Sequence, residues 1–222
     1  MNDSPVISPE DRLPPPLPAG QTPESALAAR AVLHVKSIEH PAVFNHSIRT
    51  FIYARQVNLQ QDGLQQNGVP DNDEALFLAC LFHDSGTAED NNGTQRFEVE
   101  VADAAGRFLT AEGWTPQLIQ PIWEAIALHT SPGIAERSGP LARLTRIGVR
   151  IDFGSISLLT DTDLVQKTEQ DYARMNIEHV LGSLVVAQAQ AQSSKAPVPS
   201  WPANLLAAQC NNPQNTETNP AF

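Results

Sequence analysis

The sequence has few cysteines, few basic residues and no long apolar segment, and each shortage excludes a class of protein. Only Cys80 and Cys210 occur among its 222 residues, so a disulfide framework is excluded. No apolar run approaches the roughly 18 residues that cross a bilayer, and no charged-then-apolar leader opens the chain. We therefore expect a cytoplasmic protein that makes no contact with membranes.

Basic residues are outnumbered by acidic ones. The 14 Lys and Arg against 25 Asp and Glu give a formal net charge of -11, which opposes attraction to phosphate backbones. Gly-x-Gly-x-x-Gly, Walker-type and paired Cys-x-x-Cys patterns are also absent, which excludes dinucleotide, P-loop and zinc-finger interpretations. We expect a small-molecule substrate and no nucleic-acid partner, and the sequence leaves a homo-oligomer open.

Strands with strict alternation are not evident, whereas helical periodicity begins near Ser25 and continues to about Gln192. The prediction is an all-α helical domain over 25–192, between a disordered proline-rich lead-in (1–24) and a mostly irregular, flexible C-terminal tail (193–222). A short apolar stretch near 201–206 could dock on the domain. The predicted helices cover 25–37, 42–60, 72–85, 95–112, 116–130, 139–153, 162–175 and 178–191.

Several polar residues fall on, beside or at the ends of the apolar faces of these helices: His46, His83, Asp84, His129 and Asp152. A lone histidine in such a place is more often a core residue bonded to a carbonyl. A buried carboxylate without a partner costs several kcal/mol, roughly, so it needs an arginine, a group of donors or a metal. For Asp152, Arg146 and Arg150 are nearby candidates for a purely structural ion pair.

A divalent metal accounts for the whole set at once. Two imidazoles and two carboxylates form a mixed N/O shell that suits Zn, Fe or Mn, whereas an all-oxygen shell would suggest Mg or Ca. The adjacent His83 and Asp84 could share one ion beside the end of their helix, because Gly86 lets the chain leave sharply.

The order His46, then His83-Asp84, then Asp152 resembles the H...HD...D signature of the HD-domain superfamily of metal-dependent hydrolases. The surrounding residues are similar to its cyanamide hydratase-like branch, chiefly fungal, over roughly 30–190. These residues are His46-Ser47-Ile48-Arg49, Leu81-Phe82-His83-Asp84-Ser85-Gly86-Thr87, Arg96-Phe97-Glu98-Val99, Ala127-Leu128-His129-Thr130-Ser131 and Ile151-Asp152-Phe153.

The resemblance implies an all-α HD-domain bundle and a mononuclear zinc site with His46, His83, Asp84 and Asp152 as ligands. It also implies a hydratase that adds water to the C≡N group of cyanamide to give urea, or acts on a related small nitrile or isocyanide. Two departures from the branch, Phe153-Gly154 after the last aspartate and Val101 after the Arg-Phe-Glu element, bear on the exact substrate.

In this hypothesis a metal-bound hydroxide is the nucleophile, and His129 is the candidate proton donor to the substrate nitrogen. Thr87 either orients substrate or a water, or caps the following loop. Arg96 and Glu98 are expected to serve structure, by orienting ligands or pairing with Arg49.

Two further functions stay open. One is an HD-type phosphohydrolase acting on a nucleotide or a small phosphate ester, for which Arg49, Arg143, Arg146 and Arg150 could supply a cationic pocket. The other is a catalytically silent protein in which the metal only stabilises the fold. Cys80 is expected to be a small buried apolar residue rather than a nucleophile.

Overall fold

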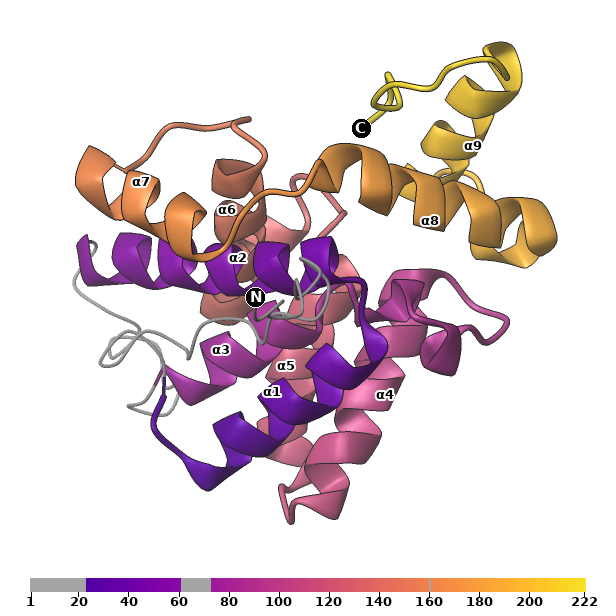
Figure 1. The fold of residues 1–222 in the computed structure, drawn as a ribbon. Helices are drawn as coiled ribbons and strands as arrows, with labels where there is room; N and C mark the ends of the chain where they lie inside the picture. Colours follow the sequence, from indigo (N-terminus) through magenta and orange to yellow (C-terminus); the bar gives the residue numbers. More distant parts are fainter. Residues whose placement is uncertain (1–22, 61–72, 160) are drawn as a thin grey trace, which may run out of the picture.

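A computed structural model describes residues 23–60, 73–159 and 161–222, and these residues form nine α-helices and no strand (Figure 1). The all-α prediction is confirmed, whereas the predicted lead-in lies almost wholly outside the described residues. The helices are α1 (Ala26–Ile38), α2 (Pro41–Gln60), α3 (Glu74–Phe82), α4 (Phe97–Ala111), α5 (Pro116–Leu128), α6 (Pro140–Asp152), α7 (Thr162–Asp171), α8 (Ile177–Ala191) and α9 (Trp201–Asn211). Short 3-10 turns cover Ser85–Thr87, Glu89–Asn91, Ala135–Arg137 and Ser193–Lys195.

Several helices begin where the sequence supplies a cap or a proline. The Ser25 hydroxyl accepts from the Ala28 amide at 2.9 Å, and the Asp161 carboxylate accepts from the Leu164 amide at 2.9 Å. Each bond satisfies an amide that has no partner inside its helix. Helices α5 and α6 begin at Pro116 and Pro140, where the missing N–H costs nothing.

Helix α3 lies inside the molecule, packed against α1, α2, α5 and α6. Every residue from Ala75 to Phe82 is buried, as expected for a helix that is apolar on all sides. Because α3 ends at Phe82, it delivers His83 and Asp84 directly into the interior. The predicted helix over 72–85 is thus slightly too long, and the His-Asp pair follows the helix instead of ending it.

Two glycines allow close approaches that position the interior polar residues. A Cβ atom at Gly148 on α6 would lie 2.3 Å from the Thr50 carbonyl oxygen on α2, so these helices cross with almost no space between them. A Cβ atom at Gly86 would lie 2.0 Å from the Phe97 carbonyl oxygen at the start of α4. Gly86 is therefore required by this contact, and its backbone does not have the positive φ of a glycine turn.

Helices α8 and α9 pack against each other at one end of the molecule, in the orange and yellow part of Figure 1. They build a second apolar cluster in which Leu181, Val185 and Leu205 contact Val43 and Phe97. The segment 193–222 thus contains a docked helix. Its apolar stretch becomes helical because the Ser200 hydroxyl caps the Ala203 amide at 3.2 Å and Pro202 occupies the first turn.

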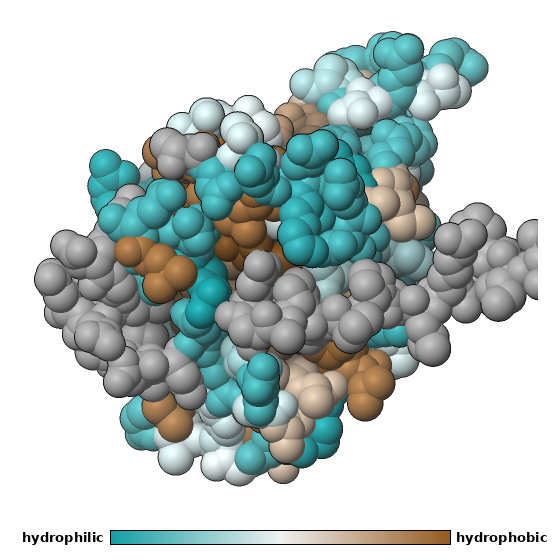
Figure 2. Space-filling view, turned by 60° about the vertical axis from the view of Figure 1, so that its left-hand side comes forward, coloured by the Kyte–Doolittle hydropathy of each residue, from teal (hydrophilic) through white to brown (hydrophobic). Residues whose placement is uncertain are grey.

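Among the described residues, no helix combines the length and the apolar character needed to cross a bilayer. In the coloured part of the face drawn in Figure 2, hydrophilic side chains are the more frequent, and the hydrophobic ones form separate patches.

Candidate metal centre

Three buried side chains converge at the centre of the molecule. His46 comes from α2, and His83 and Asp84 come from the turn after α3. The Nε2 atoms of His46 and His83 lie 3.1 Å apart, and Oδ2 of Asp84 lies 3.4 Å and 3.2 Å from them, respectively. The ligand atoms all lie within 4.8 Å of one another, a spacing that can hold one metal ion.

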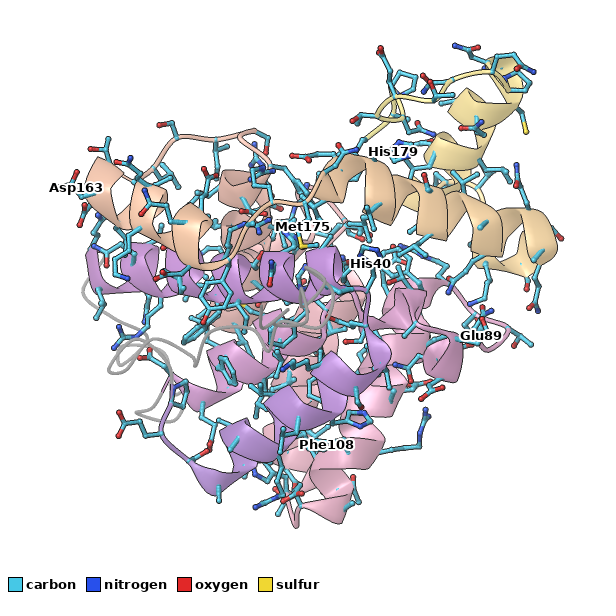
Figure 3. The ribbon with its side chains drawn as sticks, viewed as in Figure 1. His40, Glu89, Phe108, Asp163, Met175 and His179 are labelled. Carbon is cyan, nitrogen blue, oxygen red and sulfur yellow. The ribbon has the colours of Figure 1, made fainter. Side chains whose placement is uncertain are left out.

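Asp84 provides the clearest sign that this cluster needs a cation. Both of its carboxylate oxygens are buried, and neither accepts a hydrogen bond from any residue that the structure describes. An ionised carboxylate without donors is costly in the interior, and a divalent ion would satisfy both oxygens. Exposed carboxylates such as Glu89 and Asp163, which project outward from opposite sides of the molecule in Figure 3, face no such cost.

The histidines are oriented by the helices that precede them. Nδ1 of His83 lies 2.7 Å from the Cys80 carbonyl oxygen, and Nδ1 of His129 lies 2.7 Å from the Ile126 carbonyl oxygen. A carbonyl only accepts, so each Nδ1 carries a proton, and in the neutral form of each ring the lone pair is on Nε2. Both Nε2 atoms face Asp84, at 3.2 Å for His83 and 3.3 Å for His129. This is the tautomer that a metal-binding imidazole requires.

Asp152, the predicted fourth ligand, is surrounded by donors. Its two oxygens accept from Nε and one terminal nitrogen of Arg49 at 2.7 Å and 2.8 Å, and Oδ2 lies 2.6 Å from Nδ1 of His46. Arg174 adds a contact of 3.3 Å. The ion pair anticipated with Arg146 or Arg150 is instead made with Arg49 and Arg174. The role of Asp152 as a ligand stays a prediction, and its present contacts hold the His46 ring in place.

The charges in this cluster shift one another's pKa values. Burial lowers the pKa of His46 and outweighs the attraction of Asp152. Burial acts on His83 in the same direction, but the negative charge of Asp84 outweighs it and raises the pKa of that ring. For Asp84, burial works to raise the pKa, and attraction to His83 and His129 lowers it well below the usual range. Asp84 is therefore ionised at neutral pH and ready to bind a cation.

Comparison with known families gives one match. Residues 43–157, more than half of the chain, match the model of the HD domain. The chain belongs to the HD-domain family. The chain matches none of the curated proteins. HD-domain membership, together with the His46, His83 and Asp84 cluster, indicates a metal-dependent hydrolase-type enzyme with a divalent metal site.

A cavity of about 620 Å³ opens beside the metal cluster of this HD domain. Asp84 and His129 line it directly. The other lining residues named below come from the residue before α4, from α6 and the turn after it, from α9, and from the segment that follows α9. His129 is thus brought to the site, as predicted from the helical stripe that it extends. Thr87 is not among the lining residues, and its hydroxyl donates to the Asp84 carbonyl oxygen at 2.8 Å, the local cap that was the alternative to a substrate contact.

The Arg-Phe-Glu element supports one wall of the cavity. The buried Glu98 accepts from Arg96 at 2.7 Å and from the Thr130 hydroxyl at 2.6 Å. The anticipated pairing of this element with Arg49 is wrong, because Arg49 is engaged by Asp152 and by the carbonyl oxygens of Tyr172 and Ala173.

Cys80 is buried, and burial raises the pKa of its thiol to about 12, in agreement with an apolar packing role.

Sequence reasoning missed three participants. Arg174 reaches Asp152 only because the chain after α7 returns to α6, and no local pattern signals this. Trp201 and Phe222 line the cavity from the segment predicted to be mostly irregular. The only signal was the short apolar stretch near 201–206, which predicted docking but not where it would occur.

Proposed function

We propose that this HD-domain protein hydrates the C≡N group of cyanamide, giving urea, or of a related small nitrile or isocyanide. The observation that carries the proposal is that Asp84 and His129 belong to the buried site and also line the cavity. A candidate metal ligand and a candidate proton donor thus lie 3.3 Å apart at the surface that a substrate can reach. The similarity of the sequence to the cyanamide hydratase-like branch supports the same reaction.

His46, His83 and Asp84 would hold the metal, with Asp152 either as a fourth ligand or as the group that orients His46. We expect zinc, since the donors are imidazole nitrogen and carboxylate oxygen, and iron and manganese suit the same set. When bound, the ion would act as a Lewis acid and make a water molecule nucleophilic near neutral pH.

His129 would supply the proton that the reaction needs. The oxygen of water forms a bond to the nitrile carbon, one π bond of C≡N breaks, and its electron pair goes to the nitrogen. Water releases one proton as its oxygen bonds to the carbon, and the nitrogen takes a proton from Nε2 of His129, which donates in its doubly protonated form. The remaining hydroxyl proton then moves to the nitrogen as C=O forms, which gives the amide. Because the Ile126 carbonyl fixes Nδ1–H at 2.7 Å, the Nε2 side of the ring stays directed at Asp84 and the cavity.

The charges around the cavity favour an uncharged substrate. Arg96 pairs with Glu98 at 2.7 Å, and Arg146 pairs with Glu136 at 3.2 Å, so both cations are compensated by carboxylates. Arg150 favours the second candidate, a phosphohydrolase, because its closest carboxylate oxygen, on Glu136, is 4.0 Å away and its side chain is 37% exposed. One weakly paired arginine is a smaller cationic site than a polyphosphate usually requires.

The test combines metal analysis of the purified protein with two assays, urea release from cyanamide and phosphate release from a panel of nucleotides. We expect bound metal and urea formation, with His129→Ala lowering kcat about 100-fold or more while metal content is retained. His179→Ala, at a half-buried histidine of α8 labelled in Figure 3, serves as the matched control and should leave urea release unchanged. Phosphate release without urea release would overturn the proposal in favour of the second candidate.

A further inference from the structure

The cavity is much larger than cyanamide needs. Cyanamide has three non-hydrogen atoms, whereas the cavity volume of about 620 Å³ lies within the range of roughly 300–1,000 Å³ typical of sites for drug-sized ligands. If a nitrile carbon is held beside Asp84 and His129, most of the cavity is left for another part of the substrate. The residues lining that remaining space therefore indicate what the substrate carries.

Three aromatic rings in mutual contact form one part of this remaining wall. Phe153 stacks on His46 with ring centroids 4.4 Å apart, and Phe222 meets the Phe153 ring edge-on at 4.7 Å. Trp201 then meets Phe222 at 5.5 Å in the same edge-on manner. Phe153, Trp201 and Phe222 all line the cavity, so we refer to them as the aromatic wall.

Further ring contacts connect the aromatic wall to the metal centre. From Trp201 the contacts continue through Phe97 at 6.0 Å to His129 at 5.8 Å. They return through His83 to His46, with centroid distances of 4.9 Å and 5.0 Å. These contacts close a circuit of rings that begins and ends at the metal cluster. A flat apolar group beside the wall would meet ring faces and edges in fixed positions, which is the arrangement that favours aromatic partners.

We propose that the substrate carries a planar apolar group, such as an aryl ring, and that Trp201 and Phe222 are specificity residues that bind it. The inference rests on the proposed function and extends it from cyanamide to aryl-substituted cyanamides and nitriles. For an arylcyanamide, the water oxygen bonds to the nitrile carbon and one π bond of C≡N breaks as the nitrogen gains a proton. The second π bond breaks as C=O forms and the hydroxyl proton moves to the nitrogen, which gives an arylurea. The aryl group takes no part in the bond changes and contributes only binding.

The kinetic test compares cyanamide, methylcyanamide, cyclohexylcyanamide and phenylcyanamide as substrates of the metal-loaded protein. We expect kcat/KM for phenylcyanamide to exceed that for cyanamide by about tenfold or more, and to exceed that for cyclohexylcyanamide, which is similar in size but not flat. Trp201→Leu and Phe222→Leu should each lower the phenyl-to-methyl ratio by at least about fivefold. Equal ratios in wild type and both variants would overturn the proposal.

The matched control is Trp123→Leu, which replaces a tryptophan of α5 that donates to Asp103 and lies outside this cavity. It should leave all four rates unchanged, and circular dichroism of each variant checks that the helices are intact. A loss of selectivity in Trp123→Leu as large as in Trp201→Leu would contradict a local role for the aromatic wall.

A binding measurement separates this inference from the proposed function. Calorimetry with phenylurea, the expected product, needs no turnover, and we expect binding to wild type that weakens about tenfold or more in Trp201→Leu. If no cyanamide is hydrated but phenylurea still binds in this Trp201-dependent way, the hydratase proposal fails and the aromatic wall stands. If cyanamide is hydrated but phenylurea binds equally to wild type and Trp201→Leu, the wall fails and the hydratase proposal stands.

Discussion

Asp84 and Asp152 are both buried aspartates of the same centre, but their surroundings are opposite. The oxygens of Asp152 accept two hydrogen bonds from Arg49 and contact His46 and Arg174, so its charge is balanced by the protein itself. The oxygens of Asp84 accept no hydrogen bond from the described residues and face only imidazole nitrogens at 3.2–3.4 Å. One side of the centre is complete, and the other requires a cation.

This difference separates two tasks, fixing helices in place and binding a metal. The sequence pattern alone assigns both aspartates to metal binding. The Asp152 side fixes α2, α6 and the segment after α7 relative to one another, because Arg49 also donates to the carbonyl oxygens of Tyr172 and Ala173. The Asp84 side adjoins the cavity, where a metal and a substrate can meet. Changes on the Asp84 side should therefore affect chemistry directly, and changes on the Asp152 side should affect stability and, through the orientation of His46, metal affinity.

The largest effect is expected for Asp84→Asn. An amide is a much poorer ligand than a carboxylate for a first-row ion, so we expect loss of bound metal and a fall in kcat of about 1,000-fold or more, with the helical circular dichroism spectrum unchanged. Asp90→Asn, the same change at an exposed position close in sequence, is the control. Full metal content in Asp84→Asn would remove the basis for the comparison between the two aspartates.

Arg49→Met should produce the largest loss of stability. It removes both hydrogen bonds from Arg49 to the buried Asp152, which keeps only His46 and a 3.3 Å contact with Arg174, and it removes the donors to two carbonyl oxygens. We expect a loss of about 3–5 kcal/mol in the free energy of unfolding. Urea denaturation measures this change. Lys167→Met, which breaks an exposed ion pair with Asp171, should change the midpoint little. Equal midpoints for Arg49→Met and wild type would show that the Asp152 side is not structural.

The sequence predicted the helices and most of the residues at this centre because both depend on local patterns. The apolar stripe that ends at His83-Asp84 and the one that His129 extends are visible within single helices, and each was placed inside the molecule. The partners of Asp152 could not be predicted, since Arg49 and Arg174 reach it only through the crossing of α2 with α6 and the return of the chain after α7. Neighbours in sequence such as Arg150 point elsewhere on the same helix.

The wall of the cavity was unpredictable for a related reason. Trp201 and Phe222 stand beyond the matched HD domain. Phe222 meets Phe153, and Trp201 meets Phe222, only because α9 packs on α8. Both residues are recognisably apolar in the sequence, but their position on the cavity wall depends on the tertiary structure. Predicted helices thus located the candidate metal ligands, and the structure was needed to identify the residues that line the cavity.

Asp152→Asn tests how sharply the two tasks are divided. If Asp152 mainly orients His46, metal affinity should fall about 10- to 100-fold, as is typical when a partner of a metal-binding histidine is lost. Calorimetric titration with the metal measures the affinity of Asp152→Asn, and the same titration of Asp84→Asn gives the comparison. A loss as complete as that of Asp84→Asn would make Asp152 a direct ligand, as the sequence predicted, and would show that Arg49 must release it when metal binds.

The smallest effect concerns Glu39, a second buried carboxylate on the Asp84 side, to which the Ser85 hydroxyl donates. Burial, with a further contribution from the charge of Asp84, raises its pKa well above the ordinary value of 4.5. As the pH rises above 4.5, the unfolded chain releases the Glu39 proton first, so the folded state loses stability until the raised pKa is passed.

Glu39→Gln removes this loss. We expect the variant to be more stable than wild type by about 1 kcal/mol or more at pH 8, and equal to it near pH 4. Urea denaturation across this pH range tests the prediction, with the exposed Glu89→Gln as control. A gain that is the same at both pH values would mean that Glu39 is not held protonated beside Asp84. The Asp84 side would then tolerate a second negative charge, and its need for a cation would be smaller than its contacts indicate.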